Sequence, residues 1–75
     1  MFQVKWVARA RTDEPVDVET SAFRDINNVV AFCQAALFGM RARFAVGPPD
    51  GFIVVDAEGS EVRRWFLPNS DTATI

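Results

Sequence analysis

Carboxylate side chains at Asp56, Glu58 and Glu61 surround the glycine at position 59, and a segment of this kind can bind a cation. The common calcium loop places a glycine sixth and a glutamate twelfth. Counted from Asp56, however, the glycine is fourth and the twelfth residue is Leu67. The same residues suit a hairpin, because Asp56 fits the first position of a type I turn and Gly59 the left-handed position that follows. We therefore predict a turn between two strands and no metal site.

The side chains on which most enzymes and metal sites rely are scarce in this chain. It has no histidine and no tyrosine, so the commonest general acid or base is missing, and with it triad-type activation of a nucleophile. A zinc site needs several cysteine or histidine ligands, and Cys33 is the only such residue. Phosphate-binding glycine loops are also missing, because Pro48 and Pro49 lack the amides that such a loop uses. We expect no enzyme activity, no cofactor and no metal.

Cys33 itself is expected to be structural. It lies among apolar residues at helical spacing, where desolvation raises the pKa of a thiol and makes it inert. A lone cysteine cannot form an internal disulfide, and the N-terminus lacks the pattern of a signal peptide, so we expect a reducing cytoplasm. No apolar run approaches the roughly 18 residues that a membrane span requires.

Four arginines are the remaining candidates for a site: Arg41, Arg43, Arg63 and Arg64. They would form a patch for an anion or an acidic partner if the end of the helix lies over the last hairpin. Arg41 and Arg43 also suit a helix C-terminus, where cations oppose the dipole. The formal charge of −2 favours neither nucleic acid nor anionic membrane, although Trp65 stands beside two of these arginines.

The first element that must position these residues is a hairpin. Residues 2–11 alternate between an apolar and a polar face, residues 12–15 interrupt the pattern, and Val16, Val18 and Thr20 then alternate with Asp17 and Glu19. This pairing predicts that Lys5, Arg9 and Arg11 face Asp17 and Glu19, an arrangement that favours antiparallel strands.

A helix follows, with Asp25 as its N-cap and an end near Arg43. Its apolar stripe comprises Ile26, Val29, Val30, Cys33, Ala36, Leu37 and Met40. Phe32, Ala35 and Phe38 lie away from this stripe, and Ala35 and Gly39 are small enough to let another backbone approach. Either the sheet curls round the helix or a second subunit covers this part of the helix surface.

Turn-forming residues at 46–51 predict a loop, and strand formers at 52–55 and 61–67 predict a second hairpin. In the expected register, Val54, Val62 and Phe66 share one face, while Ile53, Val55 and Trp65 share the other with Glu61 and Arg63. Both faces of residues 52–55 are apolar, as in a covered strand.

The closing segment "GFIVVDAEGSEVRRWFLP" resembles the last hairpin of several small uncharacterised bacterial domains, which has the form Ile-x-Val-x-Asp-x-x-Gly-x-x-Val. The residues that resemble it are Ile53, Val55, Asp56, Gly59 and Val62, although Asp56 follows Val55 directly where the pattern has a spacer. The resemblance implies the order hairpin, helix, loop, hairpin. It implies no activity, because none is established for those domains.

Together these features predict an α+β domain over residues 1–68, with four antiparallel strands in ββαββ order and one helix across one face. Residues 69–75 are expected to be a frayed tail. Both faces of residues 52–55 are apolar, and Phe32 and Phe38 add apolar surface on the helix. In a chain of 75 residues this is more apolar surface than one helix on one sheet can bury. We therefore expect a small non-enzymatic binding module that forms a homodimer through Phe32, Phe38, Ile53, Val55 or Trp65. An anion-binding module that uses the four arginines is the alternative.

Overall fold

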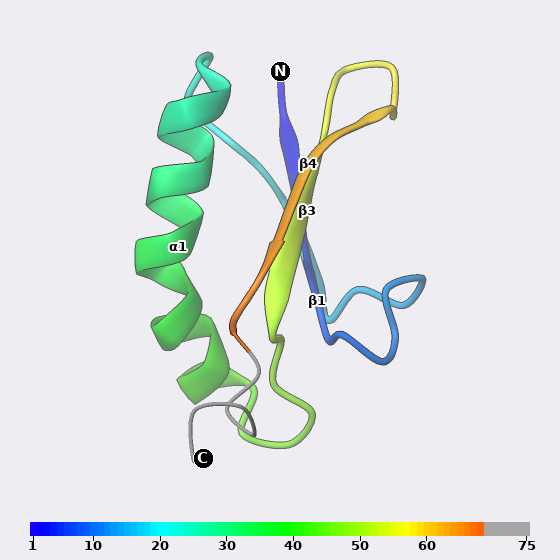
Figure 1. Ribbon diagram of the computed structural model, residues 1–75, viewed down its shortest axis with the longest axis vertical. Helices are drawn as coiled ribbons and strands as arrows, with labels where there is room; N and C mark the ends of the chain where they lie inside the picture. The colour runs from blue at the N-terminus through cyan, green and yellow to red at the C-terminus, as the bar shows by residue number, and fades with distance from the viewer. Residues whose placement is uncertain (69–75) are drawn as a thin grey trace.

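The computed structural model describes residues 1–68 and contains four strands and one helix. In chain order these are β1 (Gln3–Val7), β2 (Asp17–Thr20), α1 (Ile26–Arg43), β3 (Gly51–Val55) and β4 (Glu61–Phe66). The strands form one antiparallel sheet in the order β2-β1-β3-β4, and α1 runs beside it (Figure 1). The predicted α+β fold in ββαββ order is confirmed. The predicted frayed tail, residues 69–75, lies outside the described residues.

Local signals account for both ends of α1. The Asp25 side chain accepts a hydrogen bond from the Asn28 amide at 3.1 Å, so it caps the helix as predicted. At the other end, the Phe44 amide donates to the Met40 carbonyl at 3.1 Å, and Gly47 has a φ of 72° in the loop that follows. Within residues 1–68, no helix has the length and apolar character needed to cross a membrane.

The main core lies between α1 and one face of the sheet. Trp6 and Phe52 stand opposite each other on the two central strands, with ring centroids 5.8 Å apart in an edge-to-face arrangement. Trp65 of β4 packs against the other side of Phe52, also at 5.8 Å. The buried members of this core are Val4, Trp6, Val29, Cys33, Leu37, Met40, Phe52 and Val54. A single helix thus covers a single face of the sheet.

The register of the first hairpin differs from the prediction. Trp6 pairs with Asp17 and Val4 with Glu19, so the two acidic residues share the face of Trp6 and not that of Lys5. The predicted charge pairing across this hairpin is therefore wrong. Glu19 accepts a hydrogen bond from the indole Nε1 of Trp6 at 3.0 Å, and a buried indole N–H needs such an acceptor. Val18 of this edge strand is left 47% exposed.

The register of the second hairpin also differs, because β4 contains a β-bulge. Val54 pairs with Arg63 and Val55 with Glu61, so Val62 is the extra residue. From Arg63 onward each side chain lies on the opposite face from the one predicted. Trp65 consequently joins Phe52 on the helix face, and Phe66 packs with Val7, Ile53 and Val55 on the other face. The expectation that Trp65 shares a face with Ile53 and Val55 is wrong.

Candidate functional site

The acidic hairpin tip is a closed turn. The Gly59 amide donates to the Asp56 carbonyl at 3.0 Å, and Gly59 has a φ of 84°. The Asp56 carboxylate accepts hydrogen bonds from the amides of Glu58 and Ser60, both at 2.9 Å. These are the predicted roles of Asp56 and Gly59 in a type I turn with a left-handed glycine. Within residues 1–68, no group of three or more acidic or cysteine side chains is arranged to hold a metal ion.

Replacing Asp56 by alanine is expected to lower the free energy of unfolding by about 1 kcal/mol, because two amides of the turn lose their acceptor. Calcium at millimolar concentration should leave the melting temperature of the wild type unchanged, since a bound ligand would raise it. Thermal unfolding of both proteins, with Glu58→Ala as the control acid, measures both effects. A calcium-dependent rise that Asp56→Ala abolishes would show that the tip is a cation site.

Cys33 is fully buried against the sheet. Burial raises the pKa of its thiol from 9.0 to about 12, and the negative charge of Glu19 adds to this shift. A thiol that stays protonated is a poor nucleophile. The predicted burial of Cys33 on the apolar stripe of the helix is confirmed.

Stability should therefore fall as the pH rises above about 9. The unfolded chain ionises Cys33 near the ordinary pKa, whereas the folded chain keeps the proton up to about 12, so the folded state binds one more proton in this window. The free energy of unfolding then decreases by about 1.4 kcal/mol per pH unit from this group. Urea unfolding of wild type and Cys33→Ala between these pH values should show a shallower decline for the variant. Parallel declines would refute this assignment.

The four arginines lie in different surroundings. Arg41 donates from Nη1 to the Pro49 carbonyl at 2.9 Å and to the Asp50 carboxylate at 3.0 Å. It therefore holds the loop that leads from α1 into β3. The guanidinium of Arg43 lies 5.5 Å from the ring centroid of Phe44, in cation–π geometry.

Arg63 and Arg64 point to opposite faces of the sheet, since they stand opposite Val54 and Ile53 respectively. Arg64 donates two hydrogen bonds of 2.7 Å to the Glu61 carboxylate, and these bonds lower the pKa of Glu61 below its ordinary value. The bulge makes this pairing possible, because it brings residues three apart in a strand to the same face. Two of the four arginines thus already bind carboxylates.

Of the five predicted interface residues, only Phe32 and Phe38 are exposed. Their exposed fractions are 49% and 68%, whereas those of Ile53 and Val55 are 6% and 4%. Lys5 and Arg64 stand directly opposite Ile53 on the two neighbouring strands. Trp65 is half-buried against Phe52 on the helix side. Apolar surface is therefore available on α1 and not on the far face of β3.

The surface of α1 that points away from the sheet has an unusual composition. We call it the outer helix face, and its residues are Ala31, Phe32, Ala35, Phe38, Gly39 and Ala42, all of them exposed. A helix packed on a sheet normally carries charged residues here, yet the only charged residues of α1 are Arg41 and Arg43 in its last turn. A Cβ added to Gly39 would have no atom within 4 Å. The sheet lies on one side of α1 only (Figure 1), so it does not curl round the helix.

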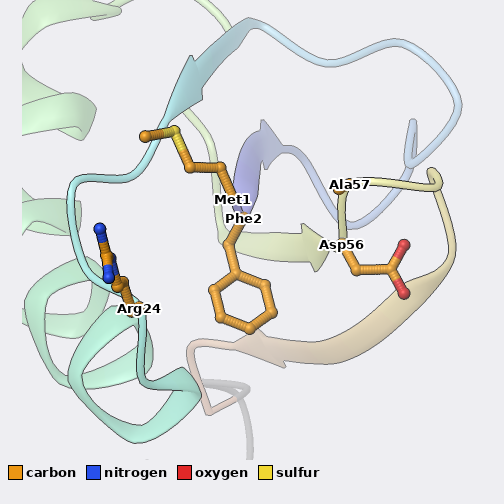
Figure 2. A pocket seen from close by; sticks show the side chains of 5 residues that line it. All are labelled: Met1, Phe2, Arg24, Asp56 and Ala57. Carbon is orange, nitrogen blue, oxygen red and sulfur yellow. The ribbon is translucent and has the colours of Figure 1, made fainter.

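A pocket of about 500 Å³ lies where the N-terminus, the hairpin tip and the segment before α1 meet. Figure 2 shows the ring of Phe2 between Arg24 on one side and Asp56 on the other. The Asp56 carboxylate points away from Phe2, in keeping with its bonds inside the turn. The two charged groups are not brought together, so this pocket lacks the convergent polar groups of a binding site.

A second cavity, of about 320 Å³, lies between the end of β2 and the first turns of α1. Its lining includes Glu19, Phe23 and Phe32, of which sequence reasoning selected only Phe32. The signal that could have found Glu19 is the need of a buried Trp6 indole for an acceptor. Nothing comparable marks Phe23, whose place depends on how the chain turns after β2.

The molecule is thus an α+β domain with α1 packed on one face of the sheet, an apolar outer helix face, and a cavity lined by Glu19, Phe23 and Phe32. Comparisons with protein-family models, with curated proteins and with solved structures found no match to this chain.

Proposed function

We propose that this protein is a small, non-enzymatic interaction module that self-associates through the outer helix face. The observation that carries the proposal is a helix surface without charge on which Phe32 and Phe38 are exposed. Contiguous apolar surface of this kind marks an interaction site on a small protein. The absence of histidine and tyrosine from the chain supports a role in binding over a role in catalysis.

A second copy of the chain is the occupant that suits this surface. Ala31, Ala35, Phe38 and Ala42 are spaced by four, three and four residues, which is the seam spacing of paired helices. Ala35 and Gly39 leave room for a facing backbone, and two phenylalanines from each copy can fill the space beside it. A two-fold axis would place the same uncharged surface on both sides, so no like charges would meet.

The geometry gives the anion-binding alternative less support. Arg41 and Arg64 already bind carboxylates, and Arg63 and Arg64 point to opposite faces of the sheet.

As part of the same proposal we place the protein in the cytoplasm. Its lone cysteine is buried and unpaired, which suits a reducing compartment.

Sedimentation equilibrium from micromolar to roughly millimolar concentration tests the proposal. We expect a reversible equilibrium between the 8.4-kDa chain and a species of twice that mass. A single species of 8.4 kDa throughout this range would remove the proposal.

A further inference from the structure

We propose that the cavity between β2 and α1 binds a primary alkylammonium group, either the side chain of a lysine in a peptide or a free amine. This site goes beyond the self-association proposed above. Phe32 belongs to both surfaces, but Glu19 and Phe23 lie outside the outer helix face, and Phe38 and Gly39 do not line the cavity, so variants at these positions separate the two proposals. The residues that line the cavity are Val4, Glu19, Thr20, Ser21, Ala22, Phe23 and Phe32.

Glu19 supplies a fixed carboxylate. It projects toward the helix side because its partner across the hairpin is Val4, a residue of the main core. The indole Nε1 of Trp6, a side chain with no exposed surface, donates to one carboxylate oxygen of Glu19 at 3.0 Å. A buried, rigid donor therefore orients a carboxylate that is itself open to solvent. Its second oxygen is free to accept a bond from a ligand.

The charge of Glu19 is not neutralised by the protein. Within residues 1–68, which include every lysine and arginine of the chain, the two ion pairs are Arg41 with Asp50 and Arg64 with Glu61. The same negative charge contributes to the raised pKa of the Cys33 thiol, so its field extends into the core beneath the cavity. A cation in the cavity would meet an unpaired carboxylate.

Two aromatic rings also line the cavity. Phe23 and Phe32 have ring centroids 5.6 Å apart with their planes tilted by 49°. The segment that carries Phe23 is held in place, because Ser21 donates its amide to the Phe2 carbonyl at 2.8 Å and its hydroxyl accepts from the Phe23 amide at 3.1 Å. Aromatic faces attract cations, and their apolar surface packs against an alkyl chain.

The Glu19 carboxylate and the two aromatic rings together determine which ligand the cavity can bind. An ammonium group satisfies the carboxylate, and a stem of a few methylene groups packs on Phe23, Phe32 and Val4. An anion would be repelled by Glu19, and a neutral apolar group would desolvate the carboxylate without pairing it. At about 320 Å³ the cavity is near the lower limit for ligand sites, which suits one side chain and not a cofactor.

Titration of the full chain with N-acetyl-lysine-methylamide, followed by NMR, tests this site. The norleucine analogue, which has the same four side-chain carbons and no ammonium group, is the uncharged probe. The reporter is the indole N–H of Trp6, because it donates to Glu19. We expect saturable shifts of this signal and of the Phe23 amide, with affinity about tenfold higher for the lysine probe than for norleucine. Equal responses to both probes, or a silent indole signal, would overturn the proposal.

Three variants test the role of Glu19 in binding. Glu19→Gln keeps an acceptor for Trp6 and removes the charge, so we expect a loss of affinity of about tenfold or more. Glu58→Gln, at the hairpin tip, makes the same change in net charge and should bind normally. Phe38→Ser alters the outer helix face alone and should also bind normally. Unchanged binding by Glu19→Gln, or loss of binding by either control, would contradict the assignment.

The source of the ammonium group is decided by comparing butylammonium with an extended peptide that carries one lysine. Since β2 is an edge strand, a peptide can also pair with its free backbone groups. Tighter binding of the peptide identifies a lysine side chain as the ligand, and equal binding identifies a free amine. Absence of binding by both would refute the site.

Discussion

Replacing Gly51 by alanine is expected to lower the free energy of unfolding by about 3 kcal/mol or more, which is a large part of the stability of a domain this small. Gly51 is the first residue of β3 and lies directly against β4. A Cβ at this position would overlap the Trp65 carbonyl oxygen and would stand 2.8 Å from the Phe66 Cα. Both are backbone atoms, so neither can rotate away, and the pairing of the two strands would have to break.

Urea unfolding measures the effect of Gly51→Ala, with Gly39→Ala as the matched control at a concentration below that of self-association. A Cβ at Gly39 meets nothing within 4 Å, and alanine is about 1 kcal/mol better than glycine inside a helix. The control should therefore be at least as stable as the wild type. A Gly51→Ala variant with the wild-type midpoint would show that β3 and β4 are not packed as described.

Replacing Phe38 by serine is expected to weaken self-association about a hundredfold or more. Phe38 is 68% exposed, so its removal should change the stability of the monomer by no more than about 0.5 kcal/mol. Burial of one phenylalanine contributes roughly 1.5–3 kcal/mol, and a symmetric dimer loses this twice. The measured quantity is the dissociation constant from sedimentation equilibrium.

Val46→Ser is the matched control for Phe38→Ser. Val46 is 96% exposed in the loop after α1, so this change also removes an exposed apolar side chain, but away from the outer helix face. It should leave the dissociation constant unchanged. If both variants dissociated equally, or if Phe38→Ser dimerised like the wild type, the outer helix face would not be the interface.

The elements of the fold could be predicted because each has a local signal. Alternation over residues 2–11, the Asp25 cap and the Asp56 and Gly59 turn depend on neighbours within a few positions. These signals set the type and order of the strands and the helix. The buried position of Cys33 followed from the helical period for the same reason.

The strand registers could not be predicted because they depend on contacts between distant residues. Alternation alone places Val18 in the core, whereas the Trp6 indole requires an acceptor and draws Glu19 to that face. In β4 the bulge at Val62 moves Trp65 to the helix side, where it packs on Phe52. One residue of shift reverses the faces of a strand, so the candidate interface moved from the sheet to the helix.

The most direct test of self-association through the outer helix face is a dilution series followed by the amide NMR signals of the wild type. We predict concentration-dependent shifts at Ala31, Ala35, Gly39 and Ala42, while the amides of β3 and β4 stay constant. Shifts centred on Ile53 and Val55 would contradict the account, as would signals that do not change at any residue over the whole concentration range.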